Sequence, residues 1–280
     1  MILVTDSAAD ITLAQAQRLD VRVVPLTITF PSGVCKQETA EDFDRFYTLL
    51  AQSRELPTTS QPAPQLYLEI YEEAKAKDEE VLVIALSAGL SGTCQAARMA
   101  AQLAEYDRIF VLDSRQAIQP QRMLVERAAE LRQAGYSATQ ILAELEELRE
   151  RVHVFGVLDS LVCLRKGGRI PAAAAILGDL MEIKPLICLT DGTLTMAGKT
   201  CGYKLAVRML LQEFEQVERD TAAPVYFGYT SNRQRGEALV EEACARFGLA
   251  HAQLYQICGV IGTHLGPETV TIAYQSPNRA

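Results

Sequence analysis

The segment of residues 87–93 carries the most informative set of potentially reactive side chains in this sequence. It reads Ser-Ala-Gly-Leu-Ser-Gly-Thr, and it joins the apolar run of residues 81–86 to a helical stretch that opens near Gln95. A strand-to-helix turn directs backbone N–H groups and the positive end of a helix toward one point, which favours an anionic ligand group. No Lys follows the glycines, so the loop is not a nucleotide-binding P-loop. We therefore predict a hydroxyl-rich anion site that includes Ser91, Gly92 and Thr93.

The same loop comes close to the G-x-S-x-G turn that carries the nucleophile of serine hydrolases, but Thr93 stands where the last Gly belongs. A hydrolase of acyl esters would use Ser91 as nucleophile, Asp113 or Asp159, and His264. The chain order Ser, Asp, His fits such enzymes. This alternative stays open beside simple anion binding.

Three other segments carry polar residues in unusual settings. Thr59 and Ser60 lie in a hydroxyl-rich stretch before two prolines, which is also how an ordinary helix start reads. Arg169 lies in the basic loop of residues 164–170, and the small apolar side chains of residues 171–177 follow it. Such side chains either pack closely on a neighbour or leave room for a slender apolar ligand. His264 is flanked by glycines in residues 262–267, where we expect a tight loop with a ligand-binding role.

Composition excludes several classes of function. A net charge of -8 over 280 residues argues against nucleic acid as the main partner. Residues 165–208 hold seven basic side chains against three acidic ones, and this stretch is either a solvated face or one that meets a partner or a phosphate. The seven Cys form no C-x-x-C pair and the three His have no metal-binding spacing, so we expect neither a metal nor a cofactor.

No apolar run reaches the ~20 residues of a membrane-spanning helix, and the N-terminus reads as a strand rather than a signal peptide. We therefore expect a cytoplasmic protein.

Hydrophobic periodicity predicts an α/β fold in two domains, residues 1–152 and 153–280. The first domain should hold a mostly parallel sheet with helices on both faces, and the second should be α+β with a mixed sheet. Ligands of a parallel sheet bind at the carboxyl ends of its strands, where the loop of residues 87–93 lies. The predicted strands are 2–5, 21–30, 81–86, 109–112, 153–158, 185–189, 193–197, 224–229, 252–260 and 269–274, and the pair 185–189 and 193–197 should flank Asp191-Gly192 as a hairpin. The predicted helices are 12–19, 43–53, 65–77, 94–104, 121–133, one from Ser137 to about 152, 204–217 and 236–247. The helix from Ser137 has Gln140 three residues on, which is the spacing of a capping box.

Taken together, these segments resemble the DegV family of bacterial fatty-acid-binding proteins, which includes the FakB subunits of fatty acid kinase. The resemblance covers the whole chain in order, through residues 5–10, 24–26, 57–64, 87–97, 113–114, 165–170, 183–185 and 262–267. It implies a two-domain α/β protein that holds a long acyl chain between its domains.

The resemblance also implies roles for individual residues. Thr59 and Ser91 would contact the carboxylate, His264 would stand behind them in the same network, and Arg169 would supply a nearby cation. The protein would bind a long-chain fatty acid without catalysing a reaction, and a separate ATP-dependent kinase would phosphorylate the carboxylate. The implied protein is a monomer with at most transient membrane contact.

Several positions depart from the family pattern. Ser7-Ala8 and Ser87-Ala88 replace the usual Ser-Ser pairs, and residues 115–120 replace a glycine- and serine-rich segment. Glu268 stands where a Gly is usual, and residues 200–203 read Thr-Cys-Gly-Tyr in a stretch that is commonly richer in Arg. That last stretch resembles the surface met by the kinase, so a lipid sensor or transporter without a kinase partner is a further alternative.

Overall fold

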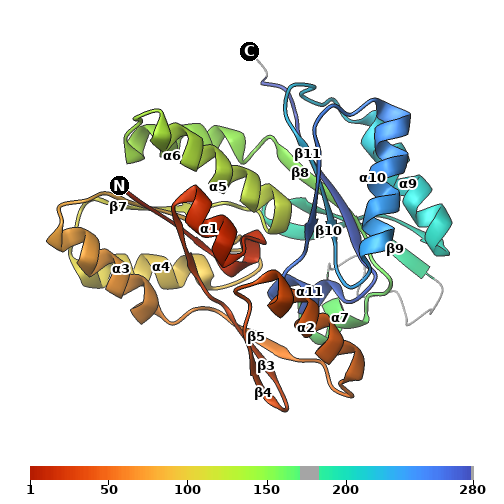
Figure 1. Cartoon of the computed structure of the whole chain (residues 1–280), viewed down its shortest axis with the longest axis horizontal. Coiled ribbons are helices and arrows are strands. Elements are labelled where there is room, and N and C mark those ends of the chain that lie inside the picture. Colours follow the sequence, from red (N-terminus) through yellow and green to blue (C-terminus); the bar gives the residue numbers. More distant parts are fainter. Residues whose placement is uncertain (171–182, 279–280) are drawn as a thin grey trace.

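A four-stranded parallel sheet forms the first part of the chain in the computed structural model, which describes residues 1–170 and 183–278 (Figure 1). Its strands are β1 (Ile2–Asp6), β2 (Val21–Val24), β6 (Val81–Ala85) and β7 (Ile109–Asp113), in the order β2-β1-β6-β7. The small apolar segment of residues 171–177 lies outside the described residues.

Helices cover both faces of this sheet, as predicted. Alternate residues of a strand point to opposite faces, and Val81 and Val83 accordingly pack with α3 (Pro64–Ala76) and α4 (Thr93–Ala104). Leu82 and Ile84 face the other way, toward α5 (Ile118–Gln133) and α6 (Ala138–Leu148). In Figure 1, α5 and α6 lie above this sheet and α3 and α4 below it. The short helix α1 (Leu13–Leu19) begins with a capping box, in which Thr12 is the N-cap.

A six-stranded mixed sheet forms the second part of the fold, as predicted. Its order is β10-β9-β8-β13-β11-β12, and every pair is antiparallel except β11 with β12. Helices α9 (Tyr203–Gln216) and α10 (Arg233–Phe247) pack on one face of this sheet. The strands are β8 (Val152–Val157), β9 (Ile183–Thr190), β10 (Thr193–Cys201), β11 (Val225–Tyr229), β12 (Ala252–Gln256) and β13 (Val270–Gln275).

The predicted hairpin between β9 and β10 is confirmed. Asp191 and Gly192 at its turn have φ of 48° and 76°, which are the positive values that a tight two-residue hairpin needs.

The predicted single strand of residues 21–30 is wrong, because Pro25 ends the first ladder. Proline has no N–H to donate to a sheet, and the chain turns from β2 into β3 (Thr27–Phe30) of a separate antiparallel sheet. That sheet also holds β4 (Gly33–Cys35) and β5 (Thr58–Ser60), and α2 (Ala40–Gln52) connects them. The hydroxyl-rich stretch with Thr59 and Ser60, which is also typical of a helix start, is therefore strand β5. The N-cap of α3 is Ala63.

The C-terminal end of the predicted strand 252–260 is also wrong. β12 ends at Gln256, and helix α11 (Gly259–Leu265) follows, so His264 lies in the last turn of a helix and not in a loop. The glycines of α11 permit close contact with α2. A Cβ on Gly259 would lie 2.5 Å from Cγ of Phe46, and one on Gly262 would lie 2.3 Å from the hydroxyl of Tyr47. The helix exists here because it packs on residues more than two hundred positions earlier.

Smaller differences concern where helices begin and end. The predicted basic loop 164–170 begins inside helix α7 (Val162–Lys166), and α5 and α10 each begin three residues before the predicted start. Asn232 caps α10, because its side chain accepts a hydrogen bond from the N–H of Arg235. In residues 1–170 and 183–278, none of the helices combines the length and apolar character required to cross a bilayer.

Buried polar side chains tie the two sheets to the start of α11. Asp10 accepts hydrogen bonds from the backbone N–H of Cys258 (2.8 Å) and from the amide of Gln119 (3.0 Å). Gln119 in turn accepts one from the hydroxyl of Thr271 on β13 (2.8 Å). Burial raises the pKa of Asp10 to about 7. This network joins the loop after β1, helix α5, strand β13 and the start of α11.

Candidate functional site

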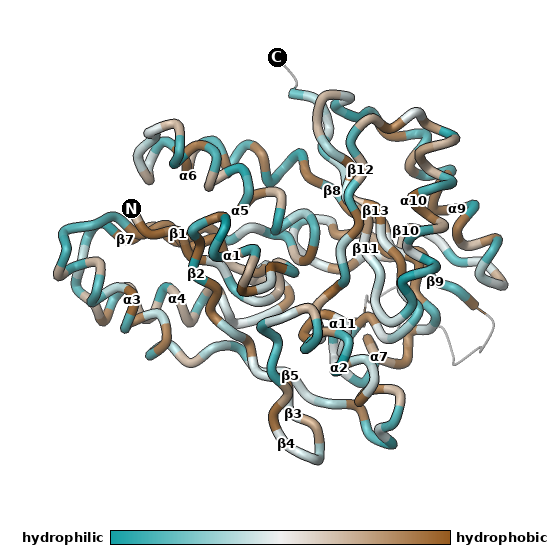
Figure 2. Tube along the Cα trace, in the orientation of Figure 1, coloured by the Kyte–Doolittle hydropathy of each residue, from teal (hydrophilic) through white to brown (hydrophobic). Residues whose placement is uncertain are grey.

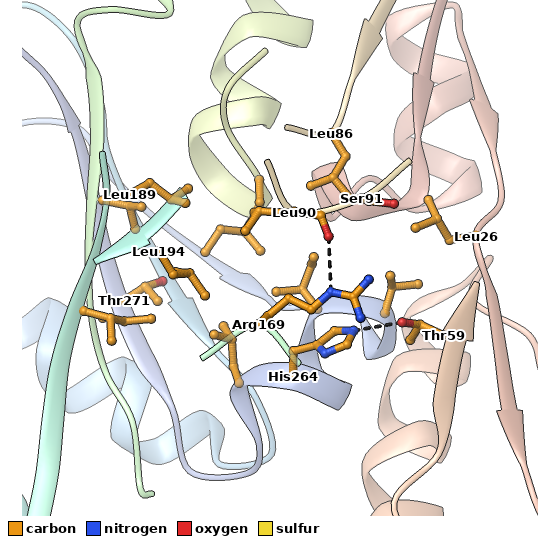
Figure 3. A pocket seen from close by; sticks show the side chains of 18 of the residues that line it. Leu26, Thr59, Leu86, Leu90, Ser91, Arg169, Leu189, Leu194, His264 and Thr271 are labelled. Atoms are coloured by element: carbon orange, nitrogen blue, oxygen red, sulfur yellow. Dashed lines mark hydrogen bonds between the residues drawn. The ribbon is translucent and has the colours of Figure 1, made fainter. Parts of the chain in front are cut away.

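A narrow cavity lies where the two large sheets, β5 and α11 meet (Figure 3). Its lining is mostly apolar, and the cavity opens in part to solvent. The apolar side chains that line it are Leu26, Leu86, Leu90, Ala117, Ile118, Val154, Ile187, Leu189, Leu194, Val260, Ile261 and Leu265.

Polar side chains gather at one end of this cavity. In Figure 3, Thr59, His264 and Arg169 lie at this end, whereas Leu189, Leu194 and Thr271 line the opposite side. The Oγ1 of Thr59 on β5 lies 2.8 Å from Nε2 of His264 on α11, which are 205 positions apart in the chain. Ser60 and Ser91 also line the cavity. The cavity therefore combines an apolar lining with a polar end.

His264 is neutral at physiological pH in this setting. Burial, assisted by the nearby positive charge of Arg169, lowers its pKa to about 4. Its Nδ1 is buried and has no hydrogen-bond partner among the described residues. An N–H at that position would be a buried donor without an acceptor, which is costly. The arrangement thus favours the proton on Nε2, where it is donated to Thr59 and leaves the hydroxyl proton of Thr59 available to a ligand.

Two glycines make room for the polar end. A Cβ on Gly167 would lie 2.2 Å from Nδ1 of His264, and a Cβ on Gly92 would lie 1.9 Å from the side-chain oxygen of Gln61. Gly92 is also the N-cap of α4, directly after Ser91. Gly92 was predicted as a site residue, whereas Gly167 and Gln61 were not. The only sequence signal for Gly167 was its pairing with Gly168.

Ser91 and Thr93 form a hydroxyl pair at the start of α4. Their oxygens lie 2.8 Å apart, and the N–H of Thr93 donates to the oxygen of Ser91 at 3.3 Å. Ser91 lines the cavity, while Thr93 is fully buried beneath it. Thr93 therefore holds Ser91 in place and does not face the cavity itself.

The described residues do not assemble a serine-hydrolase triad. The hydroxyl of Ser91 pairs with Thr93, and Nε2 of His264 pairs with Thr59. Asp113 accepts hydrogen bonds from backbone N–H groups of Ala88 and Arg115, and Asp159 pairs with Lys184 at 2.6 Å. Neither carboxylate contacts Nδ1 of His264, whereas a triad requires a base oriented by an acid.

Arg169 spans the rim of the cavity. Its Nε donates to the carbonyl of Leu90 (3.2 Å), and another guanidinium nitrogen donates to the carbonyl of Gly167 (2.6 Å). The side chain is largely exposed, so it supplies positive charge near the polar end without being buried. These two bonds join the loop before α4 to the turn after α7.

The predicted site residues are thus brought together from four parts of the chain. Thr59, Ser60, Ser91, Arg169 and His264 all line the cavity, and Gly92 and Thr93 support it from behind. Sequence reasoning missed the side contributed by the mixed sheet. There, Ile187, Gly156 and Thr271 are paired across three neighbouring strands and all line the cavity.

No metal centre is found in the part of the chain that the structure describes, because it contains no cluster of three His, Cys, Asp or Glu side chains.

Comparisons with known proteins agree with this architecture. The model of the DegV family, described as uncharacterised proteins, matches residues 1–276. A DegV domain-containing protein of Halalkalibacterium halodurans is 32% identical over 274 residues, covering 97% of each chain. A fatty-acid-binding DegV family protein of Thermus thermophilus has a TM-score of 0.86 and 35% identity, over 98% of this chain and 99% of that one. DegV of Bacillus subtilis, a fatty acid binding protein, has a TM-score of 0.85 and 27% identity, over 99% of both chains.

The depressed pKa of His264 predicts a pH-dependent stability. The pKa is about 4 in the folded protein and about 6.5 in an unfolded chain, so unfolding takes up a proton between these values and stability falls as pH falls. We expect the wild-type protein to lose about 2 kcal/mol more than His264→Gln between pH 7 and pH 5. Urea denaturation at the two pH values measures this difference. His251→Gln, at an exposed position, is the control for removal of a histidine. Equal losses of unfolding free energy in wild type and His264→Gln would contradict the lowered pKa of His264.

Proposed function

Because this chain belongs to the DegV family, we propose that it binds one long-chain fatty acid in the cavity between its domains, residues 1–152 and 153–280. The observation that carries the proposal is an apolar cavity with Thr59, Arg169 and His264 at one end. A fatty acid has the same division, with one carboxylate and one unbranched apolar chain.

The head of the fatty acid would meet neutral donors. Ser91 and Thr59 each offer a hydroxyl at the polar end, and the Nε2–H of His264 bonding to Thr59 frees the hydroxyl of Thr59 to donate outward. Hydrogen bonds to a charged group contribute about 1.5–3 kcal/mol each. Arg169 adds a positive charge at the rim. These groups would fix the position of the carboxylate.

The tail would supply most of the affinity. Each buried methylene contributes about 0.8 kcal/mol, so ten methylenes give roughly 8 kcal/mol before the costs of association. The apolar lining, from Leu26 and Leu86 to Leu189 and Leu194, offers hydrocarbon surface for this burial. The polar end of the cavity would set the orientation of the bound fatty acid, and the length of the buried hydrocarbon chain would set its affinity.

The protein itself would make no bond. We place it in the cytoplasm as a monomer, with at most transient membrane contact, and assign to it the presentation of the bound carboxylate to a separate ATP-dependent fatty acid kinase. In support, Thr59, Arg169 and His264 also border a second, outward-facing recess, so the carboxylate end is the end nearer to solvent. ATP and Mg²⁺ would belong to the partner.

Substitution of Ser91 separates head binding from folding. Ser91→Ala removes one hydrogen bond to the carboxylate, so the affinity of the lipid-free protein for palmitate should fall tenfold to a hundredfold while its unfolding midpoint stays close to wild type. Calorimetric titration and urea denaturation measure the two quantities. Ser32→Ala, on the exposed turn between β3 and β4, is the matched control. An unchanged affinity in Ser91→Ala would show that the carboxylate is bound elsewhere.

The kinase step is tested by reconstitution. With fatty acid, Mg²⁺ and ATP, we expect the purified protein alone to form no acyl phosphate, and we expect product once a fatty acid kinase subunit is added. Trapping of the product with hydroxylamine, followed by mass spectrometry, measures the yield. Product without the kinase would contradict the non-catalytic role. If no acyl phosphate forms with the fatty acid kinase subunit from the cells that make this protein, the kinase role is contradicted and the role of a lipid sensor or transporter is favoured.

A further inference from the structure

A second recess adjoins the polar end of the cavity on its outer side. It is lined by the chain leading into β5, by the end of α7 with the turn after it, and by the last turns of α11. Thr59, Arg169 and His264 line both spaces, so they form the partition between the apolar cavity and the outer recess. A carboxylate held at this partition would have one oxygen within reach of the outer recess.

The outer recess carries an excess of positive charge. Arg54, Lys166 and Arg169 line it, against one carboxylate, Glu55. Among the described residues, no hydrogen bond or ion pair engages the charged ends of Arg54 and Lys166, and both side chains are exposed. The described lining of the apolar cavity contains no cation except Arg169, which the two spaces share. Two cations without partners in one recess suit an anion of more than one negative charge.

We propose that this outer recess is a subsite for the phosphoryl group of an acyl phosphate, with Arg54 and Lys166 as its cationic ligands. The inference rests on the proposed function, because it concerns what becomes attached to the bound carboxylate. A carboxylate oxygen attacks the γ-phosphorus of ATP, and the bond from that phosphorus to the β,γ-bridging oxygen breaks. ADP leaves with the electron pair, no proton is transferred, and the fatty acid becomes an acyl phosphate.

Positive charge in the recess would act on both the transfer and its product. Charge on the phosphoryl oxygens is stabilised by positioned Arg and Lys side chains during phosphoryl transfer. The product bears two negative charges on its phosphoryl group, and Arg54 and Lys166, which have no partner among the described residues, lie on the outer side of the partition to receive them. Because Arg54 and Lys166 are exposed, a partner that carries the nucleotide can approach the same recess.

The experiment compares two ligands with the same acyl chain. One is palmitate, and the other is a long-chain β-ketophosphonate, in which a methylene replaces the bridging oxygen of the acyl phosphate and prevents its hydrolysis. Calorimetry with lipid-free protein measures both affinities in wild type, Arg54→Gln, Lys166→Gln and the double variant. Arg45→Gln, an exposed arginine on α2 outside the recess, is the matched control.

We expect each single variant to weaken phosphonate binding about fivefold to tenfold, and the double variant to weaken it more, with palmitate affinity within twofold of wild type throughout. Retained palmitate affinity also shows that the variants are folded. Unchanged phosphonate affinity in the double variant overturns the subsite, and so does an equal loss for both ligands, which would assign these cations to the carboxylate. If the wild-type protein binds neither ligand, the proposed function itself fails and the subsite fails with it.

Discussion

The hydrogen bond between Thr59 and His264 is the contact on which the rest of the site depends. It joins β5 to α11, two elements 205 positions apart, and it closes the polar end of an otherwise apolar cavity. The imidazole in this bond is neutral, because burial and then the positive charge of Arg169 lower the pKa of His264 to about 4. A protonated His264 would be a buried charge beside Arg169, with no carboxylate of the described residues in contact with it.

Much of the fold serves to place α11 where this bond can form. The backbone N–H groups at its start are held by the side chains of Asp10 and Gln37, and the hydroxyl of Tyr47 donates to the carbonyl of Ile257 just before it. Gly259 and Gly262 bring the helix into direct contact with α2. These contacts all come from the first 47 residues, so the N-terminal segment positions the C-terminal helix that carries His264. The site is therefore a property of the joined core and not of either sheet alone.

The sequence predicts those parts of the fold that local pattern determines. The buried strands β1 and β6 follow from hydrophobic periodicity, the start of α6 at Ser137 follows from capping-box spacing, and the Asp-Gly turn between β9 and β10 follows from turn chemistry. It also identifies Thr59, Ser91, Arg169 and His264, because hydroxyls, cations and glycines stand together in short segments and match a family pattern. Helix α11 was missed because long-range packing on α2 decides its conformation. The row of Ile187, Gly156 and Thr271 was missed because strand pairing, which creates the row, cannot be seen in one segment.

The central claim is that the cavity holds one fatty acid, and native mass spectrometry of the protein purified from its own cells tests it most directly. We expect a native mass higher than the sequence mass by one long-chain fatty acid. That increment should be lost under denaturing conditions, with the fatty acid recovered in the extract. A native mass equal to that of the bare chain, together with no mass increment after incubation with added fatty acids, would contradict the account.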